Sequence, residues 1–170
     1  MTNHHEKYMA QALDLARAAL DRDEFPVGCV MVHEGRIIAQ GERTGTRGAV
    51  PSEIDHAEII ALRRLESLTA PIDRKEIAVY ATLEPCLMCF GALLISGIGT
   101  LVYAYEDAMG GGTACDRTRL PALYRDNDLR IIPHVGRSES LTLLQDFFTK
   151  PHIDYWRNSY LEAYTLAQSC

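Results

Sequence analysis

The sequence predicts an α/β fold in which a central mixed sheet carries helices on both faces. Three observations predict it: two short apolar runs form a hairpin near the N-terminus, strands then alternate with helices, and two amphipathic helices close the chain. A hairpin pairs its strands antiparallel, whereas strand–helix alternation requires crossovers that pair strands in parallel.

The N-terminal part supplies a helix, the hairpin and a second helix. Apolar residues recur at helical spacing over residues 8–20, which predicts a helix. Residues 27–32 (VGCVMV) and 36–40 (RIIAQ) flank a short turn that contains glycine, so we expect a β-hairpin. The Gly-rich stretch 41–55 predicts a loop, and strong helix formers predict a helix over 56–68.

The second part alternates strands and helices. Residues 77–81 (IAVYA) and 101–105 (LVYAY) predict strands, and 85–96 predicts a buried helix that starts near its proline. Residues 129–132 predict a short fifth strand. The two closing helices are expected at 138–149 and 153–167.

Length and composition indicate a globular protein of one domain. The chain has 170 residues, of which 47% are hydrophobic and 24% charged, and we expect a single domain over residues 1–170. A chain of this length buries enough surface to fold without a metal or disulfide. A metal bound here would therefore serve chemistry.

Charge, hydropathy and cysteine content disfavour nucleic-acid-binding, membrane and secreted proteins. The net charge is −6, which disfavours broad nucleic-acid binding because that depends on Lys and Arg. No apolar run approaches the roughly 18 residues that span a bilayer, and the polar N-terminus has no apolar signal segment. With five cysteines and no such signal, we expect a reducing, cytoplasmic compartment, free thiols and no membrane partner.

Two short motifs indicate metal chemistry. His56 and Glu58 open one predicted helix, and the C-x-x-C pair Cys86 and Cys89 opens another. A C-x-x-C at a helix start places two sulfurs on one face, near the positive end of the helix dipole. One histidine completes three protein ligands, and Cys₂His with an open fourth position is typical of catalytic zinc. Glu58 is then placed to exchange a proton with a water on that zinc.

Other interpretations of these motifs remain open. The C-x-x-C pair alone is also typical of a redox-active dithiol. A structural zinc site would need a fourth ligand, for which Cys29, Cys115, His134 and His152 are available. Cys29 lies in a predicted strand and is otherwise a small core residue.

These residues resemble a known family. H-A-E followed by P-C-x-x-C is similar to the signature of the zinc-dependent deaminases of nucleobases and nucleosides, the cytidine and deoxycytidylate deaminase superfamily. Residues 25–28 (FPVG), 82–89 (TLEPCLMC) and 105–107 (YED) resemble its tRNA adenosine deaminase and guanine deaminase-like branch.

The resemblance implies a three-layer α/β/α cytidine deaminase-like fold around a mixed five-stranded sheet. The zinc-binding core would span about 25–110 and the C-terminal helices 138–167, with one zinc per subunit and usually a homodimer. His56, Cys86 and Cys89 would be the zinc ligands, and Glu58 the proton shuttle. The residues that the resemblance places against the substrate are Pro26, Val27, Arg43, Leu83, Glu84, Pro85 and Asp107.

Two departures from the family bear on the substrate. An Asn that holds the base or ribose usually stands near position 43, where this chain has Arg43. Residues 138–170 carry two Lys or Arg and four Asp or Glu, whereas the tRNA branch tends to be basic there. Both departures favour a free base, nucleoside or related heterocycle, with adenosine in tRNA as the alternative. A catalytically silent zinc-binding subunit or RNA-binding module is a second alternative, which the presence of Glu58 disfavours.

Three side-chain roles are left between alternatives. Arg43 either points into the pocket, where its fork suits a carboxylate, a phosphate or a ring acceptor, or points to solvent. Asp107 either contacts the substrate or caps a loop. Trp156, Tyr160 and Tyr164 fall at i, i+4 and i+8 of the last predicted helix. Such a stripe is typical of core or dimer packing, with a lid over the pocket or base stacking as the other options.

Overall fold

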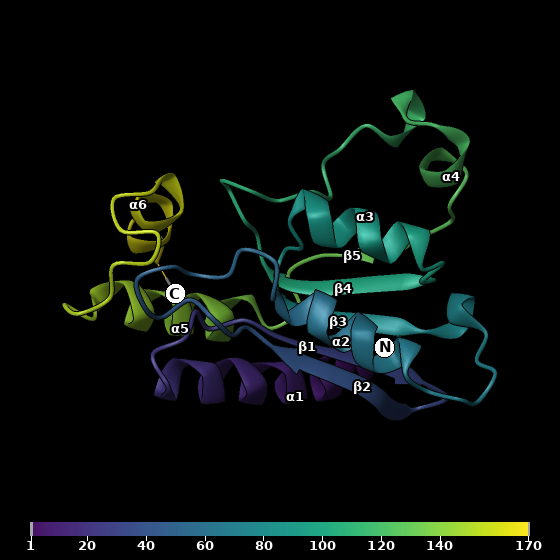
Figure 1. The fold of residues 1–170 in the computed structure, drawn as a ribbon, viewed down its shortest axis with the longest axis horizontal. Coiled ribbons are helices and arrows are strands. Elements are labelled where there is room, and N and C mark those ends of the chain that lie inside the picture. Colours follow the sequence, from purple (N-terminus) through teal and green to yellow (C-terminus); the bar gives the residue numbers. More distant parts are fainter. Residues whose placement is uncertain (1, 170) are drawn as a thin grey trace.

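The computed structural model describes residues 2–169, and these contain a five-stranded mixed sheet (Figure 1). The strand order is β2-β1-β3-β4-β5. β2, β1 and β3 pair antiparallel, whereas β3, β4 and β5 pair in parallel, so hairpin and crossover strands meet at β3. The strands are β1 (Gly28–His33), β2 (Arg36–Glu42), β3 (Ala78–Leu83), β4 (Thr100–Tyr105) and β5 (Arg130–Ile132).

Helices cover both faces of the sheet, which confirms the predicted three-layer α/β/α arrangement. In Figure 1, α1 lies below the strands and α3 lies above them. α5 contacts α1, and α2 contacts α3. α1 packs on β1 and β3, α5 packs on β4, and α2 packs on β2 and β1. None of the helices described is long and apolar enough to cross a membrane. The helices are α1 (Thr2–Asp21), α2 (Ala57–Glu66), α3 (Leu87–Ile95), α4 (Ala122–Arg125), α5 (Arg137–Thr149) and α6 (Tyr160–Leu166), with 3₁₀ turns η1 (Arg74–Glu76) and η2 (Arg117–Arg119).

Glycines on the hairpin let one helix on each face pack closely against the sheet. Gly28 of β1 lies against α1, and Gly41 of β2 lies against α2 on the opposite face. A Cβ on Gly28 would come 2.1 Å from the carbonyl oxygen of Ala12, and one on Gly41 would come 2.2 Å from that of Ala57. No side chain fits at such distances, so these glycines set how deeply both helices sit. Cys29, beside Gly28, is fully buried as a small core residue, as predicted.

The predicted elements occur near their expected positions, but α1 begins at Thr2 instead of residue 8, α4 was not expected, and the last helix is shorter than predicted. Residues 153–159, predicted to begin the last helix, form turns, and α6 starts only after them. Left-handed backbone at Trp156 (φ 56°) and Asn158 (φ 61°) interrupts the helix. The Arg157 guanidinium occupies the Ile153 carbonyl oxygen that a continuing helix would use. The expected aromatic stripe on one helix is therefore wrong, because Trp156 is not helical.

The functional residues predicted from the sequence converge on one edge of the sheet. β3 and β4 are parallel, so their carboxyl ends open at the same edge, and α3 begins shortly after β3 ends. β1 runs antiparallel to β3, so its first residue lies at this edge as well. In sheets of this kind, ligands bind beyond the carboxyl ends of the parallel strands.

Replacing Gly41 with alanine should destabilise the fold, because the new Cβ would overlap the Ala57 carbonyl oxygen. Overpacking of this kind costs about 1–3 kcal/mol. Gly91 of α3 is the matched control: nothing lies within 4 Å of a Cβ added there, and alanine is the better helix former by about 1 kcal/mol. Chemical denaturation should give a lower midpoint for Gly41→Ala and an equal or higher one for Gly91→Ala. Wild-type stability of Gly41→Ala would contradict this account of the packing.

Candidate active site

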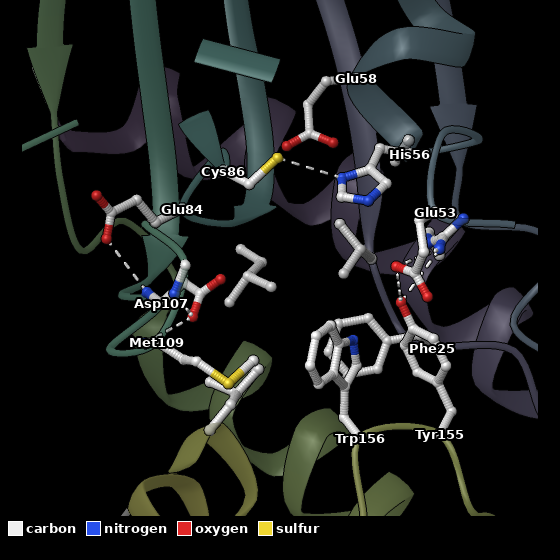
Figure 2. Close-up of a pocket in the computed structure, with 16 residues that line it drawn as sticks. Phe25, Glu53, His56, Glu58, Glu84, Cys86, Asp107, Met109, Tyr155 and Trp156 are labelled. Carbon is white, nitrogen blue, oxygen red and sulfur yellow. Dashed lines mark hydrogen bonds and ion pairs between the residues drawn. The ribbon is translucent and has the colours of Figure 1, made fainter. Parts of the chain in front are cut away.

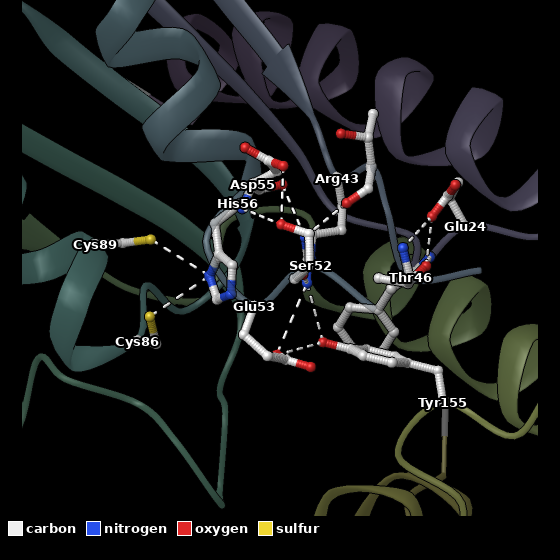
Figure 3. Close-up of polar contacts among 12 residues, drawn as sticks. Glu24, Arg43, Thr46, Ser52, Glu53, Asp55, His56, Cys86, Cys89 and Tyr155 are labelled. Atoms are coloured by element: carbon white, nitrogen blue, oxygen red, sulfur yellow. Dashed lines mark hydrogen bonds and ion pairs between the residues drawn. The ribbon is translucent and has the colours of Figure 1, made fainter. Parts of the chain in front are cut away.

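Three side chains suited to hold a metal ion meet at this edge of the sheet (Figure 3). His56 immediately precedes α2, Cys86 immediately precedes α3, and Cys89 lies in the first turn of α3. His56 Nδ1 lies 3.5 Å from Cys86 Sγ and 3.4 Å from Cys89 Sγ. The three ligand atoms all lie within 4.8 Å of one another. The structure thus brings together the three residues singled out by their spacing.

The geometry and the donor atoms of this cluster fit zinc. In a tetrahedral site, Zn–S bonds of about 2.3 Å and Zn–N bonds of about 2.0–2.1 Å place nitrogen and sulfur about 3.6 Å apart, close to both separations seen here. Two cysteines and one histidine leave the fourth position open, as in catalytic zinc sites. Within residues 2–169, the cluster has no fourth His, Cys, Asp or Glu. The residues considered as a fourth structural ligand, Cys29, Cys115, His134 and His152, are therefore not part of it.

The local electrostatics favour a thiolate at Cys86. A hydrogen bond from Cys89 and a further one with His56 lower the pKa of Cys86 to about 4, although burial opposes the shift. The same contact raises the pKa of Cys89, because the pair shares one proton. Cys86 also stands at the N-terminus of α3, where the helix dipole favours negative charge. Metal binding at such a pair releases the shared proton.

Glu58, which the resemblance suggests as the proton shuttle, lies beside the cluster. It lies in the first turn of α2 and is 3% exposed. Figure 2 shows its carboxylate facing Cys86 and His56. Burial raises the pKa of this carboxyl group above its ordinary value. A carboxyl group that titrates closer to neutral pH both accepts and donates protons readily, as a proton shuttle must.

A cavity of about 400 Å³ opens beside the cluster (Figure 2). This volume is in the range of small-molecule sites. Its wall is mostly apolar, but four carboxylate side chains and one arginine also line it. Of the predicted substrate-contact residues, Val27, Arg43, Leu83, Glu84 and Asp107 line the cavity, whereas Pro26 and Pro85 do not.

The carboxylates of Glu84 and Asp107 hold the loop that follows β4. Glu84 accepts hydrogen bonds from the backbone N–H groups of Asp107 (3.2 Å) and Thr113 (3.1 Å) and from the Thr113 hydroxyl. Asp107 accepts from the N–H groups of Met109 (3.0 Å) and Gly110 (2.8 Å). Burial raises the pKa of Asp107. Asp107 is thus a loop cap in this structure, and its contact with the substrate stays a prediction.

Arg43 adopts neither of the two orientations considered from the sequence (Figure 3). Its side chain is 3% exposed, so it does not point to solvent. Its guanidinium donates to the carbonyl oxygens of Thr44 (2.7 Å), Asp55 (2.9 Å) and Ser52, and to the Tyr155 hydroxyl at 3.1 Å. Although Arg43 lines the cavity, its Nη1 and Nη2 donors are occupied. The free fork expected of a pocket-facing arginine is therefore absent.

The cavity wall also contains residues that the sequence pattern does not indicate. Phe25, Glu53, Met109 and Tyr155 line it, and so does Trp156. Phe25 belongs to the FPVG stretch, whose resemblance to the family could have indicated that this residue lies at the cavity. Glu53 and Tyr155 come from a loop and a C-terminal turn, where no periodicity marks which side chains face a cavity.

The sequence matches a known family of metal-dependent enzymes. Residues 2–105 match the family described as the cytidine and deoxycytidylate deaminase zinc-binding region, and this span contains the three ligands and Glu58. The chain therefore belongs to this family of zinc-binding deaminases, which are hydrolases acting on C–N bonds. The His56–Cys86–Cys89 cluster is positioned to hold the one zinc ion of this family.

Similar proteins lie in the tRNA deaminase branch of this family. The tRNA-specific adenosine deaminase of Agrobacterium fabrum is 33% identical over 150 residues, which cover 86% of this chain and 95% of that protein. Subunit tad2 of the tRNA-specific adenosine deaminase of Schizosaccharomyces pombe is 33% identical over 152 residues, but these span only 38% of its length against 88% of this chain. A solved structure from a study of A-to-I editing by tRNA:A34 deaminases at the wobble position of transfer RNA is 32% identical. It has a TM-score of 0.66 and covers 81% of this chain and 99% of that chain.

The purified protein should contain about one zinc per chain, and loss of a ligand should release it. Replacing Cys86 or Cys89 with serine should weaken zinc retention at least about tenfold, since even residues behind the ligands matter that much. Cys115→Ser is the matched control, because Cys115 lies outside the cluster. Metal analysis after dialysis against a chelator gives the measurement. Equal zinc content in the Cys86→Ser/Cys89→Ser double variant and the wild type would show that the ligand set is wrong.

Proposed function

We propose that this deaminase removes an exocyclic amine from a nucleobase by hydrolysis, and that adenosine in tRNA is its first candidate substrate. The observation that carries the reaction is the buried Glu58 carboxyl group beside the zinc ligands, at one end of a largely apolar cavity (Figure 2). An acid–base group, a metal site and a base-sized space thus meet at one point.

Zinc at this site would lower the pKa of water and so supply a nucleophile near neutral pH. A Glu58 carboxylate oxygen takes a proton from the attacking water and passes it to the ring nitrogen beside the amine-bearing carbon. Glu58 then moves a second proton to the amine. The C–N bond breaks, ammonia leaves, and the water oxygen stays on the ring. Apolar wall residues such as Val27 and Leu83 exclude bulk water from these transfers.

Adenosine in tRNA is supported by the relatives. Two curated proteins at 33% identity are named for tRNA-specific adenosine deamination. The FPVG and TLEPCLMC stretches, which carry the resemblance to that branch, lie at the cavity: Phe25, Val27, Leu83, Glu84 and Cys86 all line it.

A free base or nucleoside is the second candidate, and the charge around the cavity favours it. Arg43 is the single Lys or Arg among the described residues that line the cavity, and its Nη1 and Nη2 donors are occupied. Glu53, which also lines the cavity, lies 3.9 Å from the Arg43 guanidinium, but its side chain is 54% exposed and offers an approaching phosphate no positive charge. The net charge of −6 acts in the same direction.

Ammonia release from zinc-loaded protein separates the two candidates. The panel contains adenine, guanine, adenosine, cytidine and an anticodon stem-loop RNA with adenosine at the wobble position. If tRNA is the substrate, only the RNA releases ammonia and gains inosine. Release from free bases or nucleosides alone would select the second candidate. If no compound in the panel releases ammonia, both candidate substrates are wrong and the alternative of a catalytically silent zinc-binding subunit is favoured.

Replacing Glu58 with glutamine should abolish most turnover and leave zinc in place, because Glu58 is not among the metal ligands. A positioned acid–base group contributes about 10²–10⁴-fold to the rate, so kcat should fall by that factor on whichever substrate is active. Glu139→Gln, the same exchange at an exposed residue outside the cavity, controls for the change of charge. Wild-type ammonia release by Glu58→Gln would remove Glu58 from the mechanism.

We also propose that two copies of the chain associate through α3 and α4. Leu87 and Ile95 of α3 and Leu123 of α4 are apolar side chains that are 57–62% exposed, and these helices contact each other. Exposed apolar side chains gathered in this way are typical of interaction surfaces. Light scattering should give the mass of a dimer for the wild type and of a monomer for Ile95→Glu. A monomeric wild type would contradict the homodimer.

A further inference from the structure

Residues 150–159, here called the C-terminal arch, connect α5 to α6 through turns. The Arg157 guanidinium ties the arch together. It donates to the carbonyl oxygens of Ile153 (2.6 Å), Lys150 (2.7 Å) and Phe148 (3.0 Å). The Lys150 carbonyl oxygen also accepts from the Ile153 N–H at 3.3 Å, so the end of α5 and the arch are bonded together. The arch is therefore an ordered part of the fold.

The arch carries two aromatic side chains to the active-site cavity (Figure 2). Tyr155 and Trp156 contact each other edge to face, with ring centroids 5.6 Å apart, and Phe25 packs on Tyr155 at 5.5 Å. Trp156 has left-handed backbone (φ 56°) and is 41% exposed. This backbone conformation is unfavourable for a bulky residue. Such strain beside an active site, around an exposed ring, points to a binding role.

Arg43 joins the arch to the loop that carries a zinc ligand (Figure 3). It donates to the Tyr155 hydroxyl at 3.1 Å and to the carbonyl oxygen of Asp55, the residue before His56, at 2.9 Å. The Tyr155 hydroxyl in turn donates to Glu53 at 3.1 Å. One buried side chain therefore contacts both the segment that presents His56 and the segment that closes the cavity.

We propose that Arg43 is a positioning residue and that the C-terminal arch is a substrate-selecting wall, in which Trp156 stacks on the flat face of the heterocycle. The proposal rests on the proposed function, because it takes a planar base as the substrate. Figure 2 shows the Trp156 ring on the far side of the cavity from Glu58, with Met109 across from it. Aromatic rings bind the faces of bases, and a thioether contacts the edges or faces of aromatic rings favourably.

Trp156 is the only tryptophan in the chain, so its fluorescence reports on the wall directly. The probe is purine riboside, a nucleoside without the exocyclic amine, titrated into the zinc-loaded protein. Stacking should quench the emission in a saturable way and protect Trp156 from collisional quenching by acrylamide.

Tyr155→Phe removes the hydroxyl that links Arg43 to the arch and keeps the ring. Loss of one such bond should raise the KM and the purine riboside Kd about 3- to 10-fold and increase acrylamide quenching of Trp156. We expect kcat and zinc content to stay within about twofold of the wild type, since no group at the reacting atoms changes. Tyr160→Phe is the matched control, because Tyr160 is 62% exposed and does not line the cavity.

Arg43→Lys keeps the positive charge but replaces the planar fork with one ammonium group, which cannot serve the same four acceptors. Arg43→Lys should therefore raise the KM about as much as Tyr155→Phe does, even though the positive charge is kept. A purely structural role for Arg43 would instead lower thermal stability, zinc content and kcat together, with the KM unchanged.

Two results would overturn the proposal: wild-type acrylamide quenching and Kd in Tyr155→Phe, or binding of purine riboside without any change in Trp156 emission. Failure of the proposed function looks different. If no substrate releases ammonia but purine riboside still quenches Trp156 saturably, the wall stands and the reaction is wrong. If deamination occurs without a response from Trp156, the wall alone is wrong.

Discussion

The zinc site depends on the close packing of α2 against the hairpin. His56 precedes α2, whereas both cysteines belong to the start of α3, so the ligands meet only if the sheet holds these two helix starts together. Gly41 sets this geometry because the backbone of α2 rests directly on it. The crossover from β3 then brings Cys86 to the same edge. Folding of the sheet thus supplies a preformed site, and a metal bound there stabilises the folded chain that presents it.

Arg43 holds the 44–55 loop, which leads to His56 at the same edge of the sheet. A buried guanidinium is unfavourable unless its donors are bonded, and carbonyl groups of the 44–55 loop meet that need. The benefit is mutual, because this loop has no regular secondary structure to satisfy those carbonyls. An asparagine side chain, with two N–H donors, could not bond three carbonyl oxygens and a hydroxyl. Position 43 therefore orders the wall of the cavity in this chain.

The parts of the fold and site that the sequence predicts rest on local patterns. Strand runs, helical periodicity and the C-x-x-C spacing predicted the five strands, the helices on both faces and the cluster of His56 with Cys86 and Cys89. The short helix α4 has too few residues to show a period. The last helix was predicted too long because the Arg157 guanidinium bonds the Ile153 carbonyl oxygen, which would accept a backbone hydrogen bond in a continuous helix. The contact of Arg43 with Tyr155 spans 112 positions, and no local pattern encodes a pair so far apart.

Charge inside the cavity connects the metal site with the choice of substrate. Two thiolates formally balance Zn²⁺, so the remaining field comes from the carboxylates. Glu84 and Asp107 accept hydrogen bonds from backbone N–H groups, which partly offset their negative charge. A neutral heterocycle therefore enters at little electrostatic cost. A phosphate would meet the exposed Glu53 carboxylate, whose nearby Arg43 is buried and already bonded, and would find no free Lys or Arg on the described wall. An RNA substrate would have to keep its backbone outside and offer a single base turned out of its stack.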